Sequence, residues 1–296
     1  MSDFVLTCES GADRTCEFFA SRNIPVVYFH YETDGVVYDD DLYQSISPDE
    51  FFAKIAAGAM PKTSQLGVGE YEEFWEPFVA EGKDVLHLTL SSGISGTYGS
   101  ACVAAQMLAD RYPEGGKVRV IDSLAAASGF GLLVEYAADV RDSGASLEET
   151  AAWVEEHKLN LHHWFFSTDL SSYLRGGRIS AASAIIGTAL KICPLMTVDY
   201  EGKLSPREKI RTKKRAISEM VKTMMAHVRD GVDYSGKCIL SHSACREDAE
   251  AVAALIEEQV PQLKGKIEIN NIGALIGSHT GPGTVALFFM GDKRVD

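Results

Sequence analysis

Short apolar runs alternate with helical patterns along the first half of the chain, and this alternation restricts the fold more than any other feature of the sequence. Runs typical of strands lie at Phe4–Cys8, Pro25–Tyr31, Val85–Leu90 and Val118–Asp122. Helical patterns begin near Pro48 and cover Gly69–Ala80, Gly96–Arg111 and Ala125–Arg141, with an acidic loop expected at Thr33–Asp41. Strand–helix alternation predicts a parallel sheet with helices on both faces. Such sheets bind ligands in the loops beyond the carboxyl ends of their strands.

The second half of the chain has a different pattern, which predicts a mixed sheet. Ser146 and Glu149 have the spacing of a capping box and open a helix over Ser146–Lys158 that links the two halves. Beyond it, strands are expected at Leu161–Thr168, Ile192–Val198, Lys203–Ile210, Lys237–Ser241, Lys266–Ile272 and Thr284–Met290, and helices at Lys213–Val228 and Glu247–Val260. We therefore predict two α/β domains: residues 1–160 with a mainly parallel sheet flanked by helices, and residues 161–296 with a mixed sheet.

Charge is distributed unevenly between the two predicted domains. The chain of 296 residues has a net charge of −14, which argues against a nucleic-acid partner. Residues 1–160 contain 10 Lys and Arg against 27 Asp and Glu, whereas residues 161–296 contain 18 against 15. Such asymmetry indicates two surfaces with different roles, or simply a solubility requirement.

The expected location is the cytoplasm. The first residues carry acids and only a short apolar strip, unlike a secretory signal, and no stretch approaches the roughly 18 apolar residues of a membrane span. The six cysteines, at positions 8, 16, 102, 193, 238 and 245, form no C-x-x-C pair. Reduced thiols therefore fit best.

Two polar loops in the first half could bind an anion. Thr63 and Ser64 precede the helix at Gly69–Ala80, where simple helix capping is the alternative. The second loop, Ser91–Tyr98, lies between an apolar strand and a long helix, where free backbone N–H groups and the helix dipole favour an anion. It resembles a nucleophile elbow around Ser95, but Thr97 replaces the second glycine, and no lysine completes a P-loop.

A third polar loop, Ile276–Gly283, precedes the last strand and contains His279. Its glycines and proline predict a tight turn that points a side chain outward, although a lone histidine is often structural. The three loops together offer hydroxyls, N–H groups and an imidazole. They contain neither an acid paired with His279 nor a cluster at metal-ligand spacing. Donors without a nucleophile–base pair indicate a binding site, which a buried carboxylate requires.

Two cationic segments stand apart from these loops. Arg178 lies in Ser171–Ser180, which leads into a small, apolar helix expected at Ala181–Leu190 that is either buried or lines an apolar ligand. The basic segment, Arg207–Arg215, has six cations and one acid. It is either a solvated strand end or a docking surface for an acidic partner.

Four of these segments occur in the same order in the DegV family, which the chain resembles over about Phe4 to Phe289. They are Thr63–Gln65, Ser91–Tyr98, Leu174–Ile179 and Ile272–Thr284. The resemblance implies two α/β domains with a long-chain fatty acid between them. It further implies a carrier that is not itself an enzyme: it presents the carboxylate to a separate, dihydroxyacetone-kinase-like fatty-acid kinase subunit.

Carried onto matching positions, the resemblance assigns the fatty-acid carboxylate to the following residues: Thr63, Ser64, Ser95, Gly96 and His279. Arg178 would stabilise the site or contact the kinase, and Arg211 is a further kinase contact by analogy. No catalytic residue, metal or cofactor is implied, and a transient contact with a membrane surface would serve lipid exchange. Cys193, before Pro194, departs from the bulkier or β-branched residue expected there, which bears on chain selectivity.

Two other functions remain open on the residues alone. The Ser91–Tyr98 loop suits a small-molecule phosphotransferase or a phosphosugar-binding enzyme, although a P-loop lysine and metal carboxylates are missing. A serine hydrolase would use Ser95 and His279. Fatty-acid chain length, oligomeric state and the identity of the kinase are not readable from the sequence.

Overall fold

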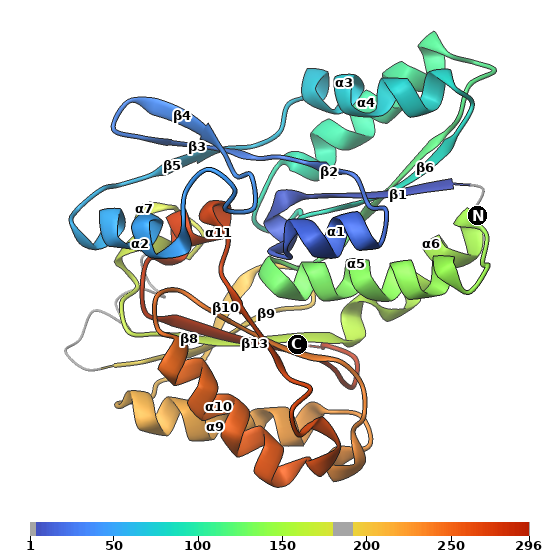
Figure 1. The fold of residues 1–296 in the computed structure, drawn as a ribbon. Helices are drawn as coiled ribbons and strands as arrows, with labels where there is room; N and C mark the ends of the chain where they lie inside the picture. The colour runs from blue at the N-terminus through green and yellow to red at the C-terminus, as the bar shows by residue number, and fades with distance from the viewer. Residues whose placement is uncertain (1–3, 180–191, 296) are drawn as a thin grey trace.

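The computed structural model describes residues 4–179 and 192–295. Its N-terminal part contains a parallel sheet with the strand order β2-β1-β6-β7. The strands are β1 (Phe4–Glu9), β2 (Val26–Val27), β6 (Asp84–Thr89) and β7 (Val118–Asp122). Figure 1 shows helices on both faces of this sheet, as the alternation of strands and helices predicts.

Helices α3 (Val68–Ala80) and α4 (Thr97–Arg111) pack together on one face of the parallel sheet. The other face is covered by α1 (Cys16–Ser21) and α5 (Ala127–Asp142), and α5 packs in turn against α6 (Leu147–His157). Helix α5 also contacts strands of the C-terminal sheet. Because it lies between two sheets, α5 is buried on nearly every side.

A small antiparallel sheet corrects two expectations. Its strands, in the order β4-β3-β5, are β3 (His30–Thr33), β4 (Val36–Asp39) and β5 (Lys62–Ser64). The prediction of a loop throughout Thr33–Asp41 is therefore wrong, as is a single strand over Pro25–Tyr31, which is divided between β2 and β3. Thr63 and Ser64 lie on a strand rather than at a helix cap, and the Glu70 side chain instead accepts from the Gly67 N–H group at 2.7 Å.

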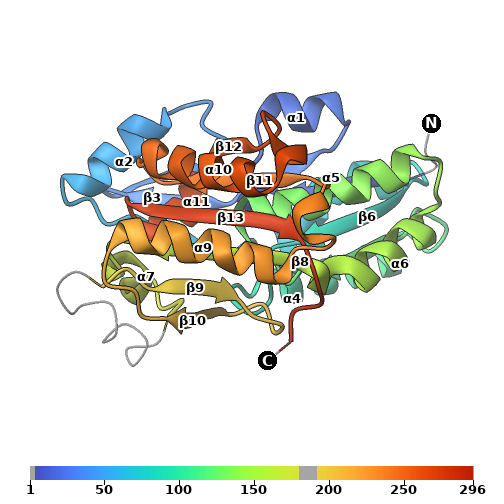
Figure 2. The same ribbon diagram turned by 90° about the horizontal axis from the view of Figure 1, so that it is seen from below.

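The C-terminal part is built on a mixed sheet with the order β10-β9-β8-β13-β11-β12. Its strands are β8 (Leu161–Ser167), β9 (Leu195–Val198), β10 (Leu204–Glu208), β11 (Cys238–His242), β12 (Glu268–Asn271) and β13 (Thr284–Met290). Helices α9 (Lys213–His227) and α10 (Arg246–Gln259) lie side by side on its outer face, as Figure 2 shows. The mixed sheet agrees with the prediction.

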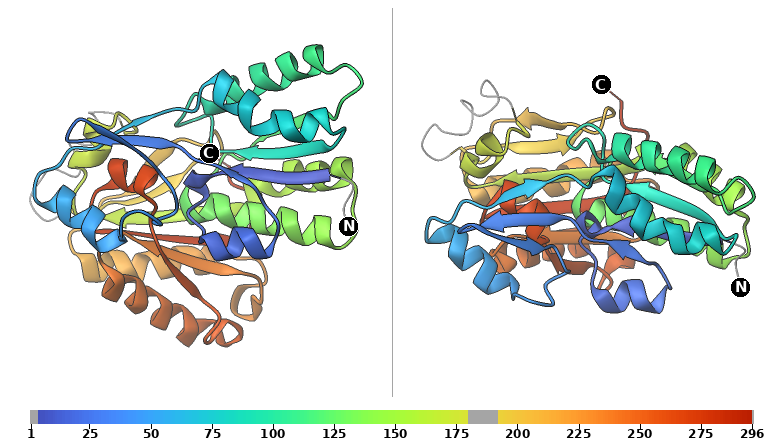
Figure 3. Two further views of the ribbon diagram at one scale, coloured as in Figure 1. Left: turned by 45° about the horizontal axis from the view of Figure 1, so that its top comes forward. Right: turned by 90° about the horizontal axis from the view of Figure 1, so that it is seen from above.

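The inner face of the mixed sheet is turned toward the N-terminal part. Short helices α7 (Ser171–Arg175) and α11 (Ala274–Thr280) pack against each other on this side. The small sheet and α2 (Pro48–Ala56) cover α11, an arrangement visible in Figures 1 and 3. Elements far apart in the sequence therefore meet around α11.

Helix α11 replaces the tight turn expected around His279. The glycines suggested a turn, but Gly277 is inside the helix, where an added Cβ would approach the rings of Phe51 and Phe52 on α2 at 2.9 Å. This glycine serves close helix packing rather than chain reversal. The helix ends before Gly281, whose φ of 63° suits glycine.

Three further predictions concern the domain boundary, the helix at Ala181–Leu190 and membrane spans. Strand β8 begins at Leu161, so we keep the proposed domain boundary between residues 160 and 161. The helix predicted at Ala181–Leu190 lies outside the described residues. Across residues 4–179 and 192–295, the helices are all too short or too polar to cross a membrane.

Candidate functional site

A cavity of about 270 Å³ lies between the parallel sheet and the mixed sheet. Its walls come from β5, the Ser91–Tyr98 loop and the start of α5 on one side, and from β8, β13 and α11 on the other. Polar groups gather at one end, which we call the polar end and define by Thr63, Ser64, Ser95, Gly96, Arg178 and His279. Ser64 and Gly96 are exposed, so the polar end opens toward solvent.

A hydrogen bond between Thr63 and His279 joins the two parts of the chain at the polar end. Thr63 Oγ1 lies 2.8 Å from His279 Nε2. Strand pairing places Thr63 opposite Tyr31 of β3, which fixes the position of the threonine. The packing of α11 against the small sheet and α7 fixes that of the histidine.

His279 is a neutral imidazole at neutral pH. Burial lowers its pKa to about 4, and the positive charge of Arg178 acts in the same direction. Its Nδ1 atom has no hydrogen-bond partner among the described residues, and Gly176 lies against this atom. A side chain at position 176 would collide with the ring, so the glycine is required for this close approach.

Arg178 brings a half-buried positive charge to the polar end. Its Nε donates to the Ile94 carbonyl at 3.2 Å, and its Nη1 donates to the Gly176 carbonyl at 2.5 Å. Burial lowers its pKa, and the described residues supply it with no carboxylate partner. A cation in this position, which donates to two neutral carbonyls, is suited to an anionic ligand.

The Ser91–Tyr98 loop contributes a hydroxyl and a helix N-terminus. Ser95 Oγ hydrogen-bonds with the Thr97 hydroxyl and accepts from the Thr97 N–H group at 3.3 Å. Gly96 is the N-cap of α4, and Gln65 lies where its Cβ would be. The positive end of the α4 dipole therefore points toward the polar end.

Six of the seven residues singled out from the sequence line this cavity, whereas Arg211 does not. Arg211 is exposed between β10 and α9, within the basic segment. Gln65 and Tyr173 also line the cavity but were not predicted as site residues. Gln65 directly follows Ser64, and Tyr173 lies in the Ser171–Ser180 segment. Tyr173 Oη lies 3.0 Å from Thr284 Oγ1, which ties α7 to β13.

Along β8 and β13, away from α7, the cavity wall is mainly apolar. We call this region the closed end and define it by Ala126, His163, Val198, Leu204 and Phe288. His163 pairs with Phe288 across β8 and β13, four residues from the Ser167–Thr284 pair beside α7. At about 3.3 Å per residue, this places the closed end about 13 Å along the strands from α7. In the sequence, the alternation of residues along β8 and β13 indicates two faces of a sheet. It does not show which of these faces lines a cavity.

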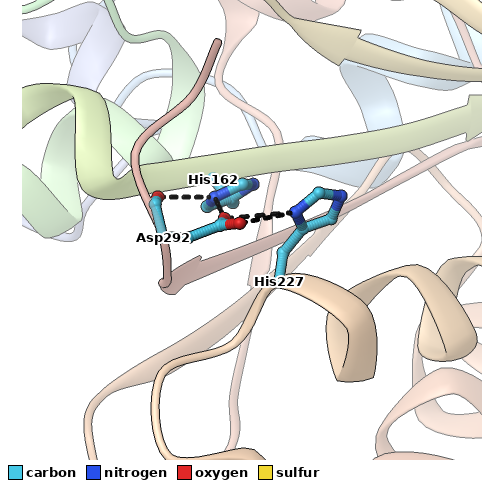
Figure 4. Close-up of side chains that lie close together, drawn as sticks. All are labelled: His162, His227 and Asp292. Atoms are coloured by element: carbon cyan, nitrogen blue, oxygen red, sulfur yellow. Dashed lines mark hydrogen bonds and ion pairs between the residues drawn. The ribbon is translucent and has the colours of Figure 1, made fainter.

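One group of side chains outside the cavity has the composition of a metal site. Figure 4 shows that His162, His227 and Asp292 converge on the far side of β8. Trp164 Nε1 donates to His162 Nδ1 at 3.3 Å, which leaves the proton of the neutral ring on Nε2. That N–H group donates to the Asp292 carbonyl at 3.0 Å. The cluster is therefore explained as a hydrogen-bond network, because a metal would need the lone pair of Nε2.

The geometry gives little support to a serine hydrolase. The Ser95 hydroxyl hydrogen-bonds with Thr97. In the described part of the chain, His279 Nδ1 has no acid to orient the ring, and Nε2 bonds to Thr63. A nucleophile–base–acid arrangement requires both contacts.

Comparison with known proteins identifies one family across the chain. A family model described as an uncharacterised protein of the DegV family matches residues 3–292. A DegV domain-containing protein of Clostridium perfringens is 35% identical over 294 residues, which cover 99% of both chains.

Two solved structures have similar folds. The structure described as fatty acid binding of a DegV family protein from Thermus thermophilus is 29% identical, with a TM-score of 0.82 over 98% of this chain and 99% of that one. The Streptococcus pneumoniae Fatty Acid Kinase (Fak) B3 protein, loaded with linoleic acid, is 20% identical, with a TM-score of 0.82 over 99% and 100%. At that identity, the second likeness shows the fold alone.

Proposed function

The chain belongs to the DegV family, and from this premise we propose that it binds a long-chain fatty acid and presents the carboxylate to a separate kinase. The observation that carries the proposal is Arg178, a half-buried cation without a carboxylate partner among the described residues, at the mouth of an apolar cavity. The fatty acid bound by the relative from Thermus thermophilus supports the choice of ligand.

In this proposal the carboxylate lies at the polar end and accepts hydrogen bonds from several donors. Ser64 and Ser95 offer hydroxyls, and Gly96 offers a backbone N–H group at the start of α4. Thr63 and His279 contribute as a pair: when the ring N–H of His279 donates to Thr63, the Thr63 hydroxyl is free to donate to the carboxylate. Hydrogen bonds to a charged group each contribute about 1.5–3 kcal/mol. Because His279 is neutral, Arg178 supplies the side-chain charge that balances the carboxylate.

The acyl chain extends from the polar end toward the closed end. Side chains there come from both parts of the chain, including Ala126 from the start of α5 and Phe288 from β13. Each methylene buried against them contributes about 0.8 kcal/mol. The protein thereby removes the chain from water and leaves the carboxylate near the surface.

The exposed polar end is the part that a partner protein could reach. Ser64 and Gly96 are both exposed, so a kinase could approach the carboxylate without unfolding the carrier. We propose a dihydroxyacetone-kinase-like fatty-acid kinase subunit as this partner, with Arg211 and the basic segment contacting its acidic surface. The carrier would work in the cytoplasm, as six free cysteines suggest, and touch membrane surfaces only to exchange lipid.

A phosphosugar-binding enzyme or phosphotransferase is the second candidate, since the N-terminus of α4 suits a phosphate as well as a carboxylate. The apolar closed end disfavours it, because a sugar requires polar partners along its length. The two proposals differ in what the purified protein contains.

Denaturing extraction of the purified protein, followed by mass spectrometry of the released small molecules, tests the proposal. We expect a long-chain fatty acid in near-equal molar amount to the protein. A phosphorylated polar compound instead, with no fatty acid binding on later addition, would contradict the proposal and support the second candidate.

A further inference from the structure

In the described part of the chain, Arg294 is a second cation buried without a carboxylate partner, and it bonds to four backbone carbonyls. The residue is 6% exposed. Its Nη1 donates to the carbonyls of Val198 at 2.9 Å and Asp199 at 2.8 Å. Its Nη2 donates to those of Leu124 at 3.0 Å and Lys158 at 3.1 Å. Burial of a charge costs free energy unless hydrogen bonds compensate for the lost water. The four carbonyls provide this compensation, and they hold the guanidinium in one position.

The four carbonyls belong to segments that lead into the closed end. Val198 itself lines the cavity, and Leu124 stands two residues before Ala126, which also lines it. One guanidinium therefore joins the β9–β10 hairpin of the C-terminal part to the β7–α5 loop of the N-terminal part. Both segments contribute residues to the closed end.

The hairpin also contacts the N-terminal part at its turn. Ser91 Oγ donates to the Gly202 carbonyl at 2.8 Å, and an added Cβ at Gly93 would lie 2.6 Å from the Gly202 backbone. Arg294 and Ser91 therefore fix the two sides of the same hairpin. Leu204 pairs with Val198 across this hairpin, and it also lines the cavity.

The backbone that carries Arg294 is anchored independently of its side chain. The Arg294 N–H group donates to the Leu159 carbonyl at 2.8 Å, and that of Gly291 donates to the Asn160 carbonyl at 2.8 Å. Asp292 adds hydrogen bonds with His162 and His227 (Figure 4). Loss of the guanidinium should therefore leave the terminal segment in place and release mainly the hairpin.

We propose that Arg294 is a positioning residue that fixes the closed end of the cavity and so sets the longest acyl chain that the protein accepts. This inference rests on the proposed function. It adds that chain selectivity depends on a residue that does not line the cavity and acts from behind its wall.

The test is the affinity of the delipidated full-length protein for saturated straight-chain fatty acids of increasing length. In the wild type, affinity should rise about fourfold per added methylene, the equivalent of about 0.8 kcal/mol. It should stop rising once the chain reaches the closed end. In Arg294→Ala the rise should continue to longer chains, and dissociation of the longest bound chain should be faster by about tenfold, a loss of about 1.4 kcal/mol in barrier height.

Lys293→Ala is the matched control, because Lys293 is the exposed neighbouring cation. It should keep the chain-length limit of the wild type. An unchanged limit in a folded Arg294→Ala would overturn the inference but leave the proposed function intact. Failure of the wild type to bind any fatty acid would instead overturn the proposed function.

A second variant covers the case in which Arg294→Ala does not fold. Leu204→Ala removes a partly exposed side chain from the same wall and leaves the four hydrogen bonds of Arg294 in place. It should also move the limit to longer chains. If the limit does not move, the hairpin is not the end wall and the inference is wrong.

Discussion

Arg178 and Arg294 are both cations without a carboxylate partner among the described residues, but Arg178 lines the polar end of the cavity and Arg294 lies behind its closed end. Arg178 is half-buried at the exposed polar end and bonds to two carbonyls of nearby segments. Arg294 is almost fully buried behind the closed end and bonds to four carbonyls from three segments. A guanidinium has five N–H donors. Backbone carbonyls accept hydrogen bonds from most of the N–H groups of Arg294. Arg178 donates to two carbonyls and lies where an anion could bind.

In our proposal the polar end recognises the carboxylate, whereas the closed end limits the length of the acyl chain. Substitutions at the polar end should weaken binding of every fatty acid by a similar factor, because they act on the shared carboxylate. Substitutions at the closed end should change the dependence on chain length.

The largest effect is expected for Arg178→Ala. Loss of the cation should reduce fatty-acid affinity by about 100-fold, or about 3 kcal/mol, at every chain length, because the carboxylate loses a charged donor in a partly desolvated site. Binding of the length series by calorimetry measures this factor. The control is Arg175→Ala, which removes an exposed arginine of α7 and should have little effect. A loss confined to long chains would mean that Arg178 acts like Arg294.

Acid should weaken the polar end by a mechanism that Arg294 does not share. The pKa of His279 is about 4 in the folded protein, below its ordinary value of 6.5. The unfolded chain therefore binds more protons between these values, and folding stability falls as pH decreases from about 6.5 to about 4. The pKa of Arg294, about 10, leaves it protonated throughout this range.

Urea unfolding of the ligand-free protein at neutral and acidic pH measures this contribution. Relative to the wild type, His279→Gln should lose about 2 kcal/mol less stability on acidification. His157→Gln, at the end of α6 and away from the cavity, serves as control. Equal acid sensitivity in His279→Gln and the wild type would mean that the ring is not buried as a neutral group.

The hydrogen bond between Thr63 and His279 should appear as energetic coupling. Thr63→Val and His279→Gln should each weaken fatty-acid binding by about 1–2 kcal/mol. The double variant should lose less than the sum of the two, by about 1 kcal/mol, because the residues share one interaction. Additive losses in this double-mutant cycle would show that the two side chains bind the ligand independently.

Ser95→Ala should have the smallest effect of the set. Removal of one neutral hydroxyl should weaken binding by about 1 kcal/mol, about fivefold, without unfolding the protein. Ser92→Ala, an exposed serine in the same loop, should bind as the wild type does. Affinity equal to the wild type in Ser95→Ala would remove this hydroxyl from the carboxylate site.

The sequence predicted the fold class and the long elements well, because their signals are local. The apolar run of β6, the long helix α4 and the capping box of α6, formed by Ser146 and Glu149, are all present. Short elements were not predicted where contacts between distant parts of the chain determine whether they form. Strand β5 has three residues and exists because β3 pairs with it, and α11 forms where Gly277 allows close contact with α2.

The two ends of the cavity also differ in how far the sequence reveals them. Thr63, Ser95 and His279 are polar residues in glycine-rich or hydroxyl-rich segments, so local chemistry pointed to them. Nothing local distinguishes Arg294, which stands beside Lys293 near the C-terminus. Its role depends on carbonyls from distant segments, and only the folded chain brings these together.

The most direct test of the central claim compares a long-chain fatty acid with its methyl ester, because the two share a tail and differ in the charged group. We expect the acid to bind at least about 100-fold more tightly than the ester, and Arg178→Ala to remove most of this preference. Equal affinity for acid and ester in the wild type would contradict it, since the polar end would then contribute nothing to recognition.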